Sequence, residues 1–244
     1  MSQLYLKLAQ LPISIQIENT STCQISAKSM TKIFIRHSLP YRIMKSVYSL
    51  VVWGCEGFQT PSPHFVKQSV LLRHALKKSI WVESGTYMGE TTRVLAKHAC
   101  KVYSIEPEPK LFASVSEFLE AWNNIQVING ASEEVFPDLL PRLEGNINFW
   151  LDGHFSAGVT YQGLNDTPVV DELRCIAENR AAFNDVCIFI DDVRCFQPDL
   201  PKFSSYPELD FLVLWAKQHG FYWSIEHDIF IMKSVLSIPE SSQS

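Results

Sequence analysis

Residues 79–92 read Ser-Ile-Trp-Val-Glu-Ser-Gly-Thr-Tyr-Met-Gly-Glu-Thr-Thr, and this stretch decides the fold. Its first part is apolar and predicts a buried strand over 79–83. Gly85 and Gly89 then allow a tight turn and a close approach of the backbone to a ligand. The helix expected next presents unpaired N–H groups at its N-terminus. The spacing, E-x-G-x-x-x-G, differs from the G-x-G-x-x-G of dinucleotide-binding proteins, so we expect a different ligand.

Apolar runs and helical patterns alternate after this unit. Strands are predicted over 101–105, 125–128, 147–151 and 186–190, with helices over 111–122 and 169–177 between them. Thr167 and Pro168 are predicted as the N-cap and first residue of the second helix. This alternation is typical of βαβ units in a mostly parallel sheet.

The C-terminal region is predicted to add an antiparallel pair of strands. A helix over 209–216 precedes two strand-like runs, 221–226 and 229–232, which only His227 and Asp228 separate. Since a parallel pair needs a longer crossover, we interpret these two residues as a structural turn. The expected fold is α/β: a Rossmann-like, doubly wound sheet of about seven strands, mostly parallel with an antiparallel C-terminal strand, plus an N-terminal extension.

Composition and charge narrow the class of protein. The chain has 244 residues, of which 46% are hydrophobic and 19% charged, as in globular proteins. A net charge of −5 argues against nucleic acid as the main partner. No apolar run approaches the roughly 20 residues that span a bilayer, and a secretory signal pattern is missing. The six cysteines are scattered without metal-type spacing, so we expect reduced thiols, a cytoplasmic location and no membrane partner.

An acidic ligand site is predicted around the glycine turn. Glu83 precedes the first glycine, where an acid repels phosphate but attracts an ammonium group. Glu106 ends the second strand, where a carboxylate can accept both hydroxyls of a ribose. S-adenosylmethionine has a ribose and an ammonium group and no phosphate, so it fits this pair. The alternative is an ordinary glycine turn with Glu106 as a solvated strand end.

Three carboxylates follow the fourth and fifth predicted strands: Asp152, Asp191 and Asp192. Because neighbouring parallel strands end at one edge of a sheet, we expect these groups to lie together. Like charges at short range must be protonated, paired or bound to a cation, and Mg²⁺ or Ca²⁺ prefers such oxygen ligands. In the alternative, Asp191 caps a turn, Asp192 pairs with Arg194, and Asp152 touches only the cofactor.

Two further segments are expected to border the site. The polar, glycine-containing loop over 153–166 is long enough to be functional, and its His154 is a candidate general base. The alternative for His154 is a hydrogen bond to the backbone. Residues 61–75 begin with prolines and continue as an amphipathic run, which predicts a helix that either lies over the cofactor mouth or simply packs on the sheet.

Together these segments resemble a group of bacterial class I S-adenosylmethionine-dependent methyltransferases over about residues 61–232. The resemblance rests on Pro63-His64-x-Val66-Lys67-Gln68, Val82-Glu83-Ser84-Gly85-Thr86-Tyr87-Met88-Gly89, Val102-Tyr103-Ser104-Ile105-Glu106, Phe149-Trp150-Leu151-Asp152-Gly153-His154-Phe155-Ser156, Thr167-Pro168, Glu172-Leu173 and Ile190-Asp191-Asp192-Val193-Arg194. It implies a methyltransferase domain over 61–235, followed by a flexible tail over 236–244. The resemblance does not extend to residues 1–60, which we expect to form an extension that serves as a lid or as a contact between copies in a homo-oligomer.

The resemblance also implies roles for single residues. The cofactor is expected to bind Glu83, Gly85, Thr86, Tyr87, Gly89, Glu106, Ser132 and Asp152. Ser132 stands where many class I enzymes have an acid for the adenine amino group. Asp152, Asp191 and Asp192 are similar to the metal ligands of catechol-type O-methyltransferases, although asparagine often takes the third position there. The acceptor's proton is expected to pass to His154, Asp152 or Asp191.

The predicted function is methylation of a small molecule, with a hydroxyl of a sugar or phenol as acceptor. A metal at the carboxylates would lower the pKa of that hydroxyl. Three other interpretations stay open: a nicotinamide-dependent dehydrogenase, a protein that binds S-adenosylmethionine without turnover, and a metal-free methyltransferase with a nitrogen or carboxylate acceptor. The missing third glycine and the antiparallel C-terminal pair argue against the dehydrogenase.

Overall fold

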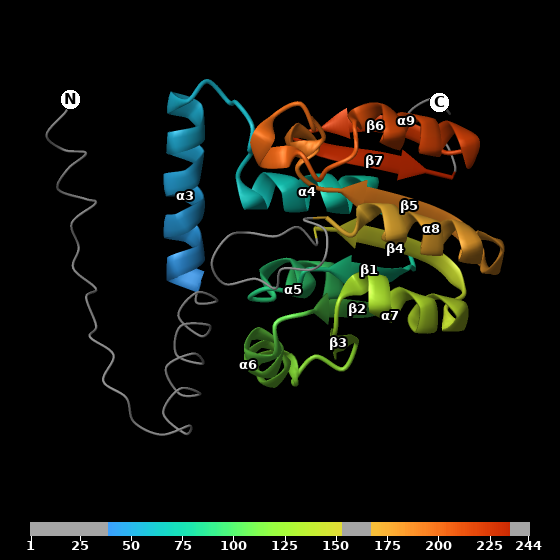
Figure 1. Ribbon diagram of the computed structural model, residues 1–244. Coiled ribbons are helices and arrows are strands. Elements are labelled where there is room, and N and C mark those ends of the chain that lie inside the picture. The colour runs from blue at the N-terminus through green and yellow to red at the C-terminus, as the bar shows by residue number, and fades with distance from the viewer. Residues whose placement is uncertain (1–38, 153–166, 235–244) are drawn as a thin grey trace, which may run out of the picture.

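The computed structural model describes residues 39–152 and 167–234, which form a central seven-stranded sheet with helices around it (Figure 1). The strands are β1 (Ile80–Ser84), β2 (Lys101–Glu106), β3 (Ile125–Asn129), β4 (Gly145–Leu151), β5 (Phe183–Ile190), β6 (Tyr222–Glu226) and β7 (Ile229–Lys233). Their order is β3-β2-β1-β4-β5-β7-β6. The strand order reverses between β1 and β4, which is the switch point where open α/β sheets bind ligands.

Strand β7 runs against its neighbours. It pairs antiparallel with β5 and with β6, whereas the pairs among β1 to β5 are parallel. His227 and Asp228 form the turn between β6 and β7, with φ of 48° and 69°. The predicted Rossmann-like, doubly wound sheet with an antiparallel C-terminal strand is therefore confirmed.

Helices other than α3 cover both faces of the sheet. The described α-helices are α3 (Leu39–Cys55), α4 (His64–His74), α5 (Glu90–Ala96), α6 (Pro109–Leu119), α7 (Ser132–Leu139), α8 (Val169–Asn179) and α9 (Leu209–Gln218). Trp81 and Val82 belong to different apolar clusters because successive strand side chains point to opposite faces. The cluster with Trp81 includes residues of α4 and α5, and the cluster with Val82 includes residues of α7, α8 and α9.

The starts of strands β4 and β5 and the N-terminus of helix α8 differ from the prediction. Strands β4 and β5 begin earlier than predicted, at Gly145 and Phe183, because polar residues continue the pairing beyond the apolar run. Helix α8 begins at Val169, so Pro168 takes the N-cap position predicted for Thr167. The Thr167 hydroxyl still accepts a hydrogen bond from Val169 N at 3.4 Å. The predicted cap is thus displaced by one residue.

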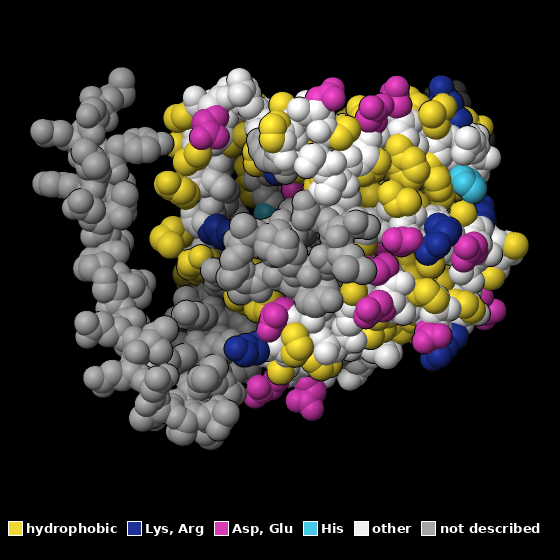
Figure 2. All heavy atoms as spheres, in the orientation of Figure 1, with side chains coloured by type: hydrophobic (Ala, Val, Ile, Leu, Met, Phe, Trp, Pro, Cys, Tyr) yellow, Lys and Arg dark blue, Asp and Glu magenta, His cyan; other side chains and the backbone are white. Residues whose placement is uncertain are grey.

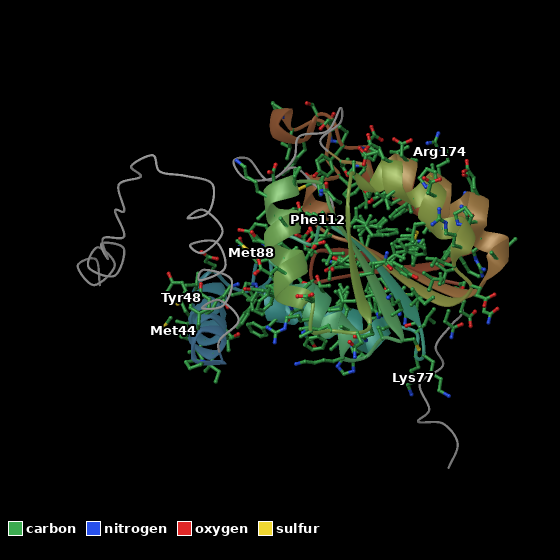
Figure 3. All side chains as sticks on the ribbon, turned by 90° about the horizontal axis from the view of Figure 1, so that it is seen from below. Met44, Tyr48, Lys77, Met88, Phe112 and Arg174 are labelled. Atoms are coloured by element: carbon green, nitrogen blue, oxygen red, sulfur yellow. The ribbon has the colours of Figure 1, made fainter. Side chains whose placement is uncertain are left out.

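Helix α3 stands apart from the sheet and carries exposed apolar side chains (Figures 2 and 3). Met44 and Tyr48, labelled in Figure 3, are 63% and 67% exposed. Lys45 ties α3 to α5 through Glu90, with the Nζ and Oε2 atoms 2.8 Å apart. The rest of the expected extension, residues 1–38, lies outside the described residues, as do the loop 153–166 and the tail 235–244. Within the described ranges, every helix is too short or too polar to cross a bilayer.

Candidate functional site

The carboxyl ends of β2, β1, β4 and β5 are joined by backbone hydrogen bonds that continue beyond the strands. Asp152 N donates to the last residue of β1 at 3.2 Å, and Asp191 N donates to the last residue of β4 at 3.0 Å. Gly85 N and Thr86 N both donate to a carbonyl of β2, at 3.0 and 3.1 Å. The glycine turn and the predicted carboxylates therefore lie along one edge of the sheet, at the switch point.

Left-handed residues shape the glycine turn. Gly85, Tyr87 and Gly89 have φ of 90°, 49° and 70°. A Cβ on Gly89 would lie 3.0 Å from a methyl carbon of Val115 in α6, so this glycine also permits close helix packing. The predicted cofactor contacts of these residues stay predictions.

Glu83 lies beneath the turn, with 1% of its surface exposed. Its Oε2 accepts hydrogen bonds from the hydroxyls of Thr92 and Ser104, both at 2.6 Å. Burial raises the pKa of Glu83 to about 7 against these hydrogen bonds, and the nearby Asp152 raises it further. Glu83 thus supports the turn from within, and the predicted contact with an ammonium group stays a prediction.

Glu106 holds the same turn from the end of β2. Its Oε2 accepts a hydrogen bond from Tyr87 N at 2.7 Å, and its Oε1 accepts one from Glu108 N at 3.0 Å. Burial raises the pKa of Glu106, while the two backbone hydrogen bonds lower it. Each carboxylate oxygen has room for a second hydrogen bond, so this arrangement is compatible with the predicted ribose contact.

Lys67 of α4 is paired with two of the predicted metal ligands. Its Nζ lies 2.5 Å from Asp191 Oδ1 and 2.8 Å from Asp192 Oδ1. Only 7% of the Lys67 surface is exposed. Burial opposes the charge of Lys67, but Asp191 and Asp192 together raise its pKa above the ordinary value. Helix α4 therefore does more than pack on the sheet, because it delivers a cation to the end of β5.

Asp191 is buried at the end of β5, with 8% of its surface exposed. Burial and the nearby Asp152 raise its pKa, although Lys67 opposes them. Asp152 thus acts electrostatically on both Asp191 and Glu83, as expected of a carboxylate at the same edge. The structure therefore places Asp152 near both Asp191 and Glu83.

Arg194 provides a second cation, which contacts Asp192. Its Nη1 donates to Asp192 Oδ1 at 2.6 Å and also to Asp228, whose Oδ1 accepts from Arg194 N at 2.9 Å. The alternative pairing of Asp192 with Arg194 is therefore present. Asp228 has a structural role, as predicted, since it clamps the β6–β7 turn to the segment after β5.

The predicted divalent metal does not fit this arrangement. Lys67 and Arg194 already neutralise Asp191 and Asp192, and Asp192 Oδ1 accepts from both cations. In the part of the chain that the structure describes, no three His, Cys, Asp or Glu residues gather closely enough to hold a metal ion. The two carboxylates expected to share a metal with Asp152 are therefore paired with side-chain cations instead.

Sequence reasoning assigned no role to Lys67 or Glu172. Lys67 lies one turn before Val70 and Leu71 on the buried side of α4, and a charge on an apolar helix face was the available signal. Glu172 likewise lies on the buried side of α8. Burial raises the pKa of Glu172 to about 7, although the nearby Ser132 and Ser84 hydroxyls lower it.

Glu172 borders an open recess beside the carboxylates. The recess has a cavity volume of about 10 Å³, roughly enough for one water molecule, and its wall includes Thr167, Glu172, Asp191 and Tyr206. Glu172 Oε1 and Ser84 Oγ are buried without a hydrogen-bond partner at normal distance among the described residues, but the two side chains are neighbours, since the Ser84 hydroxyl stabilises the Glu172 carboxylate.

The remaining predicted residues divide into two groups. Ser132 is the first residue of α7, where it is buried beside Glu172 after the end of β3. His154 and the rest of the loop 153–166 lie outside the described residues, so the general base proposed there stays a prediction.

Known proteins resemble this chain in structure and not in sequence. No protein-family model and no curated protein matches the sequence. Among solved structures, the 23S rRNA methyltransferase ErmE is 16% identical with a TM-score of 0.45, over 72% of this chain and 68% of that one. A SAM-dependent methyltransferase from Aquifex aeolicus is 15% identical with a TM-score of 0.44, over 68% and 87%. The N-methyltransferase NodS from Bradyrhizobium japonicum WM9, in complex with S-adenosyl-L-homocysteine, is 12% identical with a TM-score of 0.43, over 68% and 84%.

Proposed function

We propose that the protein is an S-adenosylmethionine-dependent methyltransferase whose acceptor is a hydroxyl of a small molecule, of the sugar or phenol type. The observation that carries the proposal is the acidic turn at the switch point, where Glu106 holds Tyr87 N at 2.7 Å and Glu83 lies directly beneath. The sheet order and the reversal at β7 are compatible with this function.

The charge of this edge favours one cofactor class over another. Glu83, Glu106 and Asp152 would repel the pyrophosphate of a dinucleotide. The same carboxylates suit a ligand that carries a ribose, an ammonium and a sulfonium. Glu106 is the group best placed for ribose hydroxyls, because it ends β2 beside the glycine turn.

The chemistry supplied by bound S-adenosylmethionine is an electrophilic methyl group on a sulfonium. Glu83, Glu106 and Asp152 would hold the cofactor, and a carboxylate of this chain would take the proton that the acceptor hydroxyl loses on methylation. Asp152 is the proposed proton acceptor, since it lies between the turn and Asp191 at the end of β4. Holding the reacting atoms in line supplies much of the acceleration of such a transfer.

A small, hydroxylated acceptor is supported by charge rather than by a pocket. The recess beside Asp191 has a cavity volume of only about 10 Å³, roughly one water molecule, so it does not by itself define an acceptor site. A net charge of −5 favours such an acceptor over nucleic acid.

Calorimetric titration of the full chain with S-adenosylmethionine tests the proposal. We expect micromolar binding that Glu106→Ala weakens at least tenfold, because the ribose loses its acceptor. Glu117→Gln, a position on α6 away from the site, is the matched control and should bind as the wild type does. Absence of binding to the folded wild type would refute the proposal. Binding without methyl transfer to any of a panel of sugars and phenols would favour the non-catalytic alternative.

A further inference from the structure

The carboxylates after β5 converge on a single cation, which the chain itself provides. Lys67 Nζ lies 2.5 Å from Asp191 Oδ1 and 2.8 Å from Asp192 Oδ1. Protein-bound Ca²⁺ lies at about 2.3–2.6 Å from its oxygen ligands and Mg²⁺ at about 2.0–2.1 Å. The ammonium therefore occupies nearly the point that a divalent ion between these two oxygens would take.

The chain also provides a second positive charge at this point. Asp192 Oδ1 accepts from Arg194 Nη1 at 2.6 Å as well as from Lys67. Lys67 and Arg194 together match the charge of a divalent cation. Arg194 is in turn held by Asp228. Asp191 and Asp192 therefore each have a side-chain cation as partner within the described residues.

The position of Lys67 in its helix indicates why the ammonium is at this point. Lys67 is buried with Val70 and Leu71 on one side of α4. A lysine stem can lie along apolar surface while its charged end reaches a polar group. Val70 and Leu71 of α4 belong to the same apolar cluster as Phe189 of β5. This packing fixes α4 relative to β5 and so fixes the position of Lys67 at the end of the strand.

We propose that Lys67 is the resident cation of this site and stands in for a divalent metal ion, so that removal of its side chain exposes a latent metal site made by Asp191 and Asp192. As a consequence that rests on the proposed function, the methyl transfer requires no added divalent ion. Lys67 acts as a positioning residue here, because it fixes the two carboxylates beside the recess.

A purely structural role makes a different prediction. If Lys67 only braces α4 against β5, its loss weakens the fold but creates no affinity for metal. A gain of metal binding therefore distinguishes the two roles, and stability alone does not.

The experiment measures binding of Mn²⁺ to metal-free protein by electron paramagnetic resonance of the free ion. Lys67→Ala opens space between the carboxylates, whereas Lys67→Met removes the charge but fills the space. We expect Lys67→Ala to bind one Mn²⁺ at least tenfold more tightly than the wild type or Lys67→Met. Adding Asp191→Asn to Lys67→Ala should abolish the gain. Lys110→Ala, at an exposed position on α6, should behave as the wild type does.

Two results would overturn the inference. One is stoichiometric Mn²⁺ binding by the wild type as tight as that of Lys67→Ala, since the lysine would then not hold the site. The other is a folded Lys67→Ala variant that binds Mn²⁺ no better than Lys67→Met. If Lys67→Ala shows no cooperative thermal transition in chelator, millimolar Mn²⁺ should restore one, and failure to do so also overturns it.

Titration of the same samples with S-adenosylmethionine separates this inference from the proposed function. Absence of S-adenosylmethionine binding in every sample, wild type included, refutes the methyltransferase and leaves the Mn²⁺ result valid. Wild-type binding of S-adenosylmethionine that is unchanged by chelator supports both.

Discussion

Replacement of Glu83 by glutamine should remove a pH dependence of stability that this one buried carboxyl creates. The folded protein raises the pKa of Glu83 from an ordinary 4.5 to about 7, chiefly through burial. Below pH 4.5 the group is protonated in both the folded and the unfolded chain. As the pH rises toward 7, only the unfolded chain releases the proton, so the folded state loses stability. The loss is complete once the pH exceeds the folded pKa.

The size of this loss follows from the gap between the two pKa values. From 4.5 to about 7, at about 1.4 kcal/mol per pKa unit, the free energy of unfolding should fall by about 3 kcal/mol. A glutamine has the carbonyl needed to accept the hydrogen bonds from Thr92 and Ser104 and carries no titrating proton. The Glu83→Gln variant should therefore overtake the wild type in stability as the pH rises.

Urea unfolding between pH 4.5 and pH 8.5 measures this effect as the difference between wild type and Glu83→Gln. Taking the difference cancels the titration of Glu172 and Asp191, which is present in both proteins. Glu117→Gln, at an exposed position on α6, is the matched control for the loss of one carboxylate outside the site. A wild-type minus Glu83→Gln difference that stays constant within about 1 kcal/mol would refute the reasoning on burial.

Three further substitutions are tested by thermal or urea unfolding, two at supports of the site and one, Asn148, at the opposite edge of the sheet. Gly89→Ala should lower the free energy of unfolding by about 1–2 kcal/mol, because φ is 70° and the new Cβ would lie 3.0 Å from Val115. An unchanged unfolding midpoint would contradict this packing. Asp228→Asn should cost about 3 kcal/mol, since it leaves Arg194 with one carboxylate fewer, and a neutral effect would show that the clamp is dispensable. Asn148→Ala should cost about 2 kcal/mol by breaking the 2.6 Å bond from its Nδ2 to a serine hydroxyl and leaving a backbone N–H unpaired; a loss below about 0.5 kcal/mol would count against that role.

The sequence determined the sheet well because its signals are local. The apolar runs after Ser79 and the helical spacing between them predicted β1 to β5, and the two-residue link at His227 predicted the reversal at β7. Both signals depend on residues within one element or one turn. Boundaries shifted where polar residues lie within a strand, as at Asn184 and Asp185 of β5, because pairing with a neighbouring strand overrides composition.

The sequence also indicated which edge of the sheet carries the site. Residues that end parallel strands must meet at one edge, so the strand pattern alone was enough to place Glu106, Asp152 and Asp191 there. Their protonation and partners could not be predicted in this way. The hydroxyls that satisfy the buried Glu83 come from β2 and α5, which the local pattern does not reveal.

Only the tertiary structure decided what neutralises the carboxylates. Lys67 and Asp191 are separated by 124 positions in the chain, and no periodicity relates them. Their contact depends on how α4 packs across the sheet, which is set by many apolar side chains acting together. The sequence therefore predicted that Asp152, Asp191 and Asp192 must be protonated, paired or bound to a cation, and it favoured Mg²⁺ or Ca²⁺. The tertiary structure instead pairs Asp191 and Asp192 with Lys67, because helix α4 packs across the sheet.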